Sequence, residues 1–198
     1  MLLIGAIIIV SSIVIIDFSI SRPSIMSEKR AMEARFEGDI FKNLLNELNN
    51  TMVFSYDKPF SITTNVFDFA NFTEAKMNEH SIGFKFLYVG SIANKTTSVL
   101  NVSLINMLGA TIDANFTLSD GQSNATTGIV NHGRWSTVNF TITPGAQYTL
   151  NLTYDSTTES IIIKTKGDKD VYAGLYYVSL EGADSTHTGK YQKTFNLE

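Results

Sequence analysis

Cysteine is absent from the 198-residue chain, which has only 3 prolines and 17% charged residues. The missing cysteine excludes a disulfide-stapled scaffold and any thiolate metal site. Lysine and arginine total 15 against 19 aspartates and glutamates, so the net charge is −4. This balance excludes a strongly basic nucleic-acid-binding protein, and we expect no nucleic acid among the partners. Hydrophobic residues make up 43% of the chain, which is enough for a packed core.

Charge is also missing from the first sixteen residues, MLLIGAIIIVSSIVII, and Asp17 is the first charged side chain. Twenty helical residues span roughly 30 Å, about the thickness of a bilayer core, so residues 1–20 can form an apolar helix of that length. A secretory signal peptide and a single-span anchor are two alternatives. Both usually carry a basic residue close to the apolar run, whereas the first one here is Arg22. Removal of a short basic leader ahead of Met1 would explain the uncharged start.

The next segment, residues 24–50, has the periodicity of an amphipathic helix. Charges of alternating sign separate its apolar residues and can pair along the exposed face. Pro23 lacks an N–H and predicts a kink or an interruption just before this segment. We expect one nearly continuous helix from residue 2 to about residue 50, with its C-terminal half docked on the domain that follows. The apolar stripe consists of Ile25, Met32, Phe36, Ile40, Leu44, Leu48 and Met52.

After residue 51 the helical spacing disappears and short alternating runs follow one another, separated by Gly, Asn or Asp. Such runs are typical of antiparallel strands in a sandwich or barrel. The runs lie at 81–89, 98–105, 110–119, 135–143, 147–154, 160–166 and 173–180, with weaker candidates at 61–67 and 190–197 and an ambiguous stretch at 69–78. We therefore predict an α+β chain: a long N-terminal hydrophobic helix (1–50, with an apolar segment at 1–20 and an amphipathic extension at 24–50), then an antiparallel all-β, Ig-like sandwich head (51–198).

Asn-x-Ser/Thr triplets are the strongest chemical signal in the predicted head. The 16 asparagines and 40 serines and threonines of the chain predict about three such triplets by chance, and eight occur. In several of them the central residue is apolar, so alternation turns the asparagine to solvent, where a glycan can be carried without disturbing the core. The alternative is that polar strand faces are simply rich in these residues. The predicted glycosylation sites are Asn49, Asn71, Asn94, Asn101, Asn115, Asn124, Asn139 and Asn151.

Signals for catalysis are weak. The three histidines lie far apart in sequence, without the spacing of a metal-binding motif, and no nucleophile-elbow or phosphate-loop motif occurs. His132 lies next to Gly133, and a solvated turn histidine is the simplest interpretation. Asp168 and Asp170 allow a loop calcium site, although a solvated hairpin is the default. We expect no enzymatic activity, no catalytic residues, no metal and no cofactor.

The order of segments resembles that of type IV pilins, and more closely that of the archaeal type IV pilin-like filament proteins. An apolar segment starts at residue 1, a kink-prone Pro23 follows, an amphipathic extension runs to about residue 50, and a β-rich head completes the chain. The resemblance implies a clipped leader, N-terminal helices bundled into a filament core and heads forming the outer wall. It departs from bacterial pilins, which usually carry a glutamate near the start and often a head disulfide. The predicted core-packing residues are Leu2, Leu3, Ile4, Ile7, Ile8, Val10, Ile13, Val14 and Ile16.

This resemblance implies a structural subunit of an extracellular pilus-like filament, serving adhesion or surface attachment. Its partners would be identical subunits in a helical homopolymer, N-glycans, and the membrane before assembly. The competing hypothesis is a single-span, membrane-anchored surface protein whose β head binds a ligand such as a sugar or a cell-envelope component. Detection of this chain as the major protein of sheared filaments would distinguish assembly from anchoring.

Overall fold

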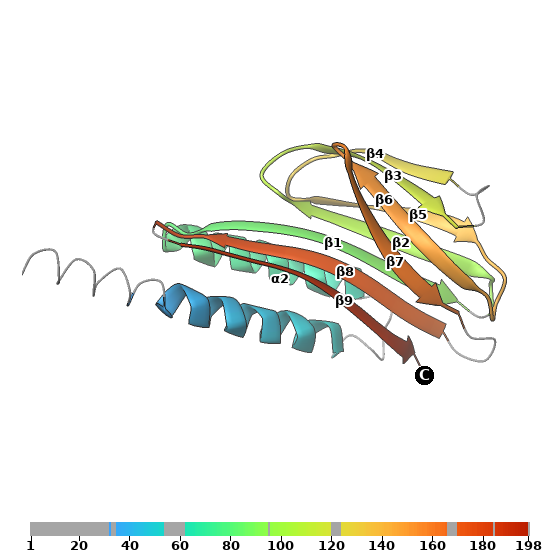
Figure 1. Cartoon of the computed structure of the whole chain (residues 1–198), viewed down its shortest axis with the longest axis horizontal. Helices are drawn as coiled ribbons and strands as arrows, with labels where there is room; N and C mark the ends of the chain where they lie inside the picture. Colours follow the sequence, from blue (N-terminus) through green and yellow to red (C-terminus); the bar gives the residue numbers. More distant parts are fainter. Residues whose placement is uncertain are drawn as a thin grey trace, which may run out of the picture.

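In the computed structural model of the protein, the described residues form two helices, a five-stranded sheet and a four-stranded sheet, arranged in three layers (Figure 1). The apolar segment 1–20, its core-packing residues and Pro23 lie outside the described residues, so the structure does not test those predictions. The structure describes residues 32, 35–53, 62–94, 96–119, 124–165, 170–183 and 185–197.

The described elements are a first helix covering residues 35–53, a second helix, α2 (Ile62–Glu79), and nine strands: β1 (Gly83–Asn94), β2 (Val99–Met107), β3 (Ile112–Leu118), β4 (Asn124–Val130), β5 (Arg134–Thr141), β6 (Gln147–Tyr154), β7 (Thr157–Lys164), β8 (Asp170–Glu181) and β9 (Thr186–Leu197). The larger sheet has the order β5-β2-β1-β8-β9, and the smaller has the order β4-β3-β6-β7. Every pairing is antiparallel.

The five-stranded sheet is covered on both faces, which explains why its central strands are apolar almost throughout. Leu87 and Val89 of β1 belong to the core between the two sheets. Phe86 and Tyr88 of the same strand belong to the core between this sheet and the helices. Successive side chains of a strand point to opposite faces, so a strand buried on both sides needs large apolar residues at nearly every position.

Tyrosines form the centre of the helix-facing core. Tyr88 and Tyr172 are fully buried, and their hydroxyl oxygens lie 2.9 Å apart. Each ring lies over a glycine two residues further along its own strand, Gly90 and Gly174, and these two glycines pair directly across β1 and β8. The Tyr172 hydroxyl also lies 3.5 Å from the sulfur of Met52 on the first helix. The glycines therefore leave the space into which the tyrosine rings fold under the helix.

The predicted fold class is wrong for the described residues, which are mostly β, with 56% strand, and include only two short helices. No long apolar helix is seen among the described residues. The head is not all-β either, because α2 occupies the segment where a strand was expected at 61–67. The spacing of Ile62, Val66 and Ala70, four residues apart and all buried, is the helical signal for α2.

The Ig-like assignment is also wrong. In an immunoglobulin sandwich the first strand lies at a sheet edge, whereas β1 is the middle strand of the five-stranded sheet. The sandwich arrangement of two antiparallel sheets is present, and all seven main strand predictions fall on strands, as does the weaker one at 190–197. The sequence pattern did not predict β4, whose residues NATTGIV contain no clear alternation.

The alternation within the predicted strands turns seven large apolar residues toward the core, and six of these are buried: Phe84, Phe86, Val102, Phe116, Phe140 and Leu152. The seventh, Ile162, is 47% exposed, and its neighbours Ile161 and Ile163 are buried instead. The run of three isoleucines gives no alternation, so the pairing of β7 with β6, and not local pattern, decides which faces the core.

Candidate functional site

The predicted glycosylation sites on the outer face of the four-stranded sheet lie on neighbouring strands. Asn115 of β3 is exposed, and Asn151 of β6 is half-buried. The Asn151 side-chain oxygen accepts a hydrogen bond of 2.7 Å from Ser160 on β7. Phe116 and Leu152, the central residues of these two triplets, are buried on the opposite face. The expected alternation therefore holds at these two triplets.

Asn101 and Asn139 meet on the five-stranded sheet, where β2 and β5 place them directly opposite each other. The Asn101 amide nitrogen donates to the Asn139 side-chain oxygen at 2.8 Å. Asn139 is exposed, whereas Asn101 is half-buried and its triplet partner Ser103 is only 3% exposed. In the folded protein a modifying enzyme could therefore reach the Asn139 triplet more easily than the Asn101 triplet.

The other triplets lie in helices and turns. Asn49 lies in the first helix, half-buried, and its side-chain oxygen accepts a hydrogen bond of 3.1 Å from Tyr176. Asn71 lies in α2, where the triplet threonine, Thr73, is buried. The Asn94 side chain closes a turn by accepting from the backbone N–H groups of residues 96 and 97. Asn124 starts β4, and its side chain lies outside the described portion of the structure.

We expect native protein to carry N-linked sugar at Asn115 and Asn139 and none at Asn49, which is half-buried in the first helix and accepts a hydrogen bond from Tyr176. Asn115→Gln and Asn139→Gln should each lower the intact mass by one glycan, measured by mass spectrometry with glycopeptide mapping. Asn131→Gln is a matched control, because Asn131 is exposed but belongs to no triplet. An intact mass equal to the bare 21.9 kDa chain would contradict the prediction.

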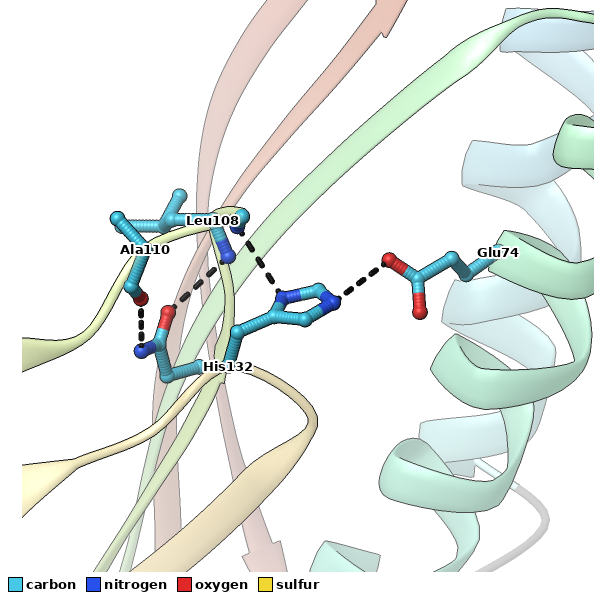
Figure 2. A network of polar contacts seen from close by, with 6 residues as sticks. Glu74, Leu108, Ala110 and His132 are labelled. Atoms are coloured by element: carbon cyan, nitrogen blue, oxygen red, sulfur yellow. Dashed lines mark hydrogen bonds and ion pairs between the residues drawn. The ribbon is translucent and has the colours of Figure 1, made fainter.

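A polar network joins α2 to two turns at the end of the five-stranded sheet (Figure 2). The His132 ring accepts a hydrogen bond at Nδ1 from the backbone N–H of Gly109 at 3.1 Å. Its proton therefore sits on Nε2, which lies 3.1 Å from a carboxylate oxygen of Glu74. Asn106 holds the same two turns together, because its side-chain amide nitrogen donates to the backbone oxygens of Ala110 and Val130, each at 2.8 Å. His132 is exposed in a turn, as predicted, and its ring also links this turn to α2.

A second polar cluster ties the first helix to the connection between β8 and β9. The Ser185 hydroxyl donates to the buried carboxylate of Glu37. The Nε2 of His187 lies 3.2 Å from the same hydroxyl, and its ring stacks on Phe41 with centroids 5.9 Å apart. In a hydrolase triad the acid orients the histidine, whereas here the carboxylate holds the serine itself. These contacts therefore attach the first helix to the β8–β9 connection and its neighbouring residue on β9.

Neither a metal centre nor a membrane-spanning helix is found among the described residues. No group of three acidic or histidine side chains in this portion of the chain could hold a metal ion. Neither of the described helices combines the length and hydropathy that crossing a bilayer requires. No family model and no curated protein matches the sequence.

Sequence reasoning missed a cleft between the two sheets, lined by Tyr154, Glu159, Tyr177 and Lys190. These residues come from β6, β7, β8 and β9, and no motif connects them. Only a correct pairing of the strands in both sheets could have brought them together.

Proposed function

We propose that the protein is a structural subunit of an extracellular, type IV pilus-like filament, and not an enzyme. Apolar N-terminal segments of many copies would pack in the filament core, with the two-sheet bodies outside for adhesion or surface attachment. Before assembly the same segment would hold the subunit in the membrane. The order of segments along the sequence supports this proposal.

The observation that carries the proposal is a change of environment along the apolar stripe of the first helix. Leu44, Leu48 and Met52 of this stripe are buried against the protein's own sheet and α2. Toward the N-terminal end the stripe emerges, and Met32 and Phe36 are 68% and 63% exposed. Met32 and Phe36 are four residues apart and so lie on one helix face, and contiguous exposed apolar surface of this kind is typical of a contact with another molecule.

The body is suited to the outer position because its helix-facing core fixes the first helix firmly. Phe84 and Phe86 stack with ring centroids 6.0 Å apart, and Phe86 stacks in turn with Tyr88 at 6.4 Å. Leu44, Leu48 and Met52 of the helix share one core with these β1 rings, so a force applied along the N-terminal segment would reach the five-stranded sheet through that core. Identical contacts repeated by a screw operation would give an open filament and not a closed ring.

We expect Ile8→Asp to abolish filament formation while the body still folds, because an unpaired carboxylate among packed apolar segments has no water to solvate it. Phe36→Asp should reduce filament yield roughly tenfold or more, because the exposed ring would lose its contact in the assembly. The measurement is the amount of this chain in filaments sheared from cells, quantified by mass spectrometry.

Ile162→Asp is the control for Phe36→Asp. Ile162, like Phe36, is an exposed apolar residue, but it lies on the outer face of the four-stranded sheet. Its filament yield should equal that of the unmodified protein. Unchanged yield for Ile8→Asp, or absence of this chain from sheared filaments of expressing cells, would contradict the proposed function.

A further inference from the structure

A cleft of about 450 Å³ opens at one end of the sandwich, within the range of small-molecule sites. There β1, β8 and β9 extend beyond the end of the four-stranded sheet, which does not cover this part of the larger sheet (Figure 1). The cleft lies where the apolar layer between the sheets stops. Its lining includes Leu108, Tyr154, Glu159, Tyr177, Thr188 and Lys190.

Strand register shows that both sheets contribute inward-facing side chains to this cleft. Tyr177 and Lys190 are direct partners across β8 and β9, and Tyr177 also pairs with Leu87, which belongs to the core between the sheets. On β7, Glu159 alternates with Ile161 of that same core, so its side chain points to the same side. The polar side chains thus replace the apolar layer at the end of the sandwich.

The cleft combines aromatic rings with one hydrogen-bond acceptor group and one donor group. The Lys190 ammonium and the Glu159 carboxylate form an ion pair across the gap between the sheets. Half of the Lys190 side chain remains exposed, and Tyr154 and Tyr177 are partly buried beside the pair. Burial, and secondly the Glu159 charge, raise the pKa of Tyr154, so its hydroxyl keeps a proton to donate.

A buried hydroxyl without a partner lies next to this cleft. Ser179 is 1% exposed, and its hydroxyl makes no hydrogen bond among the described residues. It pairs across β8 and β9 with Thr188, which lines the cleft, one row of side chains beyond Tyr177 and Lys190. Buried hydroxyls are nearly always satisfied in folded proteins, so a water molecule or a polar ligand group is expected to pair with this one.

We propose that this cleft binds a neutral saccharide. A sugar ring offers a C–H face that packs on tyrosine rings and hydroxyls that both donate and accept hydrogen bonds, as Glu159 and Lys190 require. A purely apolar ligand would remove water from the ion pair and leave its remaining N–H groups and carboxylate lone pairs without partners. An anion would meet Glu159, and a cation would meet Lys190. This binding activity goes beyond filament formation and does not depend on it.

The test is saturation-transfer NMR on the full chain in amine-oxide micelles, which have no sugar headgroup to compete, with maltotetraose and diacetylchitobiose as probes. We expect saturable transfer from at least one probe, with a Kd on the order of 1 mM or tighter. Glu159→Gln and Lys190→Met should each weaken binding about tenfold. Circular dichroism melting would show that each variant remains folded.

Lys193→Met is the matched control, because Lys193 lies on the same strand, is exposed, and is absent from the cleft lining. It should bind the probe as the unmodified protein does. Absence of transfer from both saccharides, or equal loss of binding in Lys190→Met and Lys193→Met, would overturn the proposal. Either result would leave the filament proposal standing, because that proposal is tested by sheared filaments and not by ligand binding.

Discussion

Gly90→Ala is expected to destabilise the protein by about 3 kcal/mol, the upper end of the usual cost of overpacking a core. A Cβ built on Gly90 would overlap the hydroxyl and ring of Tyr88, which is fully buried and hydrogen-bonded to Tyr172. The ring has no space to retreat, because Tyr88 is fully buried in the core between the five-stranded sheet and the helices. At about 2–4 °C per kcal/mol for a chain of this size, the melting temperature should fall by about 6–12 °C.

Gly83→Ala is the matched control on the same strand, where the position is exposed and a Cβ would meet only Glu181, its Cβ at 3.3 Å and its backbone oxygen at 3.5 Å. Its effect should stay within about 0.5 kcal/mol, as is usual for surface substitutions. In a Tyr88→Leu background the cost of Gly90→Ala should shrink, because the overlapping hydroxyl is gone. Equal melting temperatures for Gly90→Ala and Gly83→Ala would show that the tyrosine does not occupy the space above Gly90.

Raising the pH from 10.0 toward 12 should unfold the protein steeply. Burial raises the pKa of Tyr88 and Tyr172, and raises that of Tyr176 from 10.0 to about 12. Above pH 10.0 the unfolded chain loses phenolic protons that the folded chain still holds. Stability is therefore fully present below pH 10.0 and is lost as the pH rises through about 12. A tenfold difference in the acid dissociation constant of a tyrosine between the folded and unfolded states changes the free energy of unfolding by about 1.4 kcal/mol per group.

Urea unfolding midpoints measured across this pH range, together with the ultraviolet absorbance of phenolate, provide the measurement. We expect the phenolate signal of the buried tyrosines to appear only together with unfolding. Tyr176→Phe should reduce the loss of stability with pH, because it removes one of the titrating groups. Ionisation of all eight tyrosines near pH 10 in a protein that remains folded would contradict this account.

The tyrosine layer also bears on how the first helix is held. Tyr172 contacts Met52 and Tyr176 donates to Asn49, so two hydroxyls reach the helix from one strand. At the other end of the described helix, Glu37 holds Ser185 of the β8–β9 connection. The helix is therefore attached to the five-stranded sheet at both ends, as a subunit that transmits load from an N-terminal segment would require.

Local pattern by itself determined most of the strands and the docked portion of the first helix. The alternation in β3, with Ile112, Ala114, Phe116 and Leu118 buried, is visible in the printed residues because only one face of that strand is covered. The four-residue spacing of Leu44, Leu48 and Met52 likewise marks the face that packs on the sheet. Such signals are short-range and depend only on which side of an element meets water.

Tertiary structure decided the features that join distant segments. Tyr88 and Tyr172 meet although 84 residues separate them, and Glu159 meets Lys190 only because β7 packs over β8 and β9. The central strands carry apolar residues on both faces, so their pattern does not say which face meets the helices and which meets the second sheet. Strand pairing and layer packing make that choice, because side-chain volume on each face must match the layer that covers it.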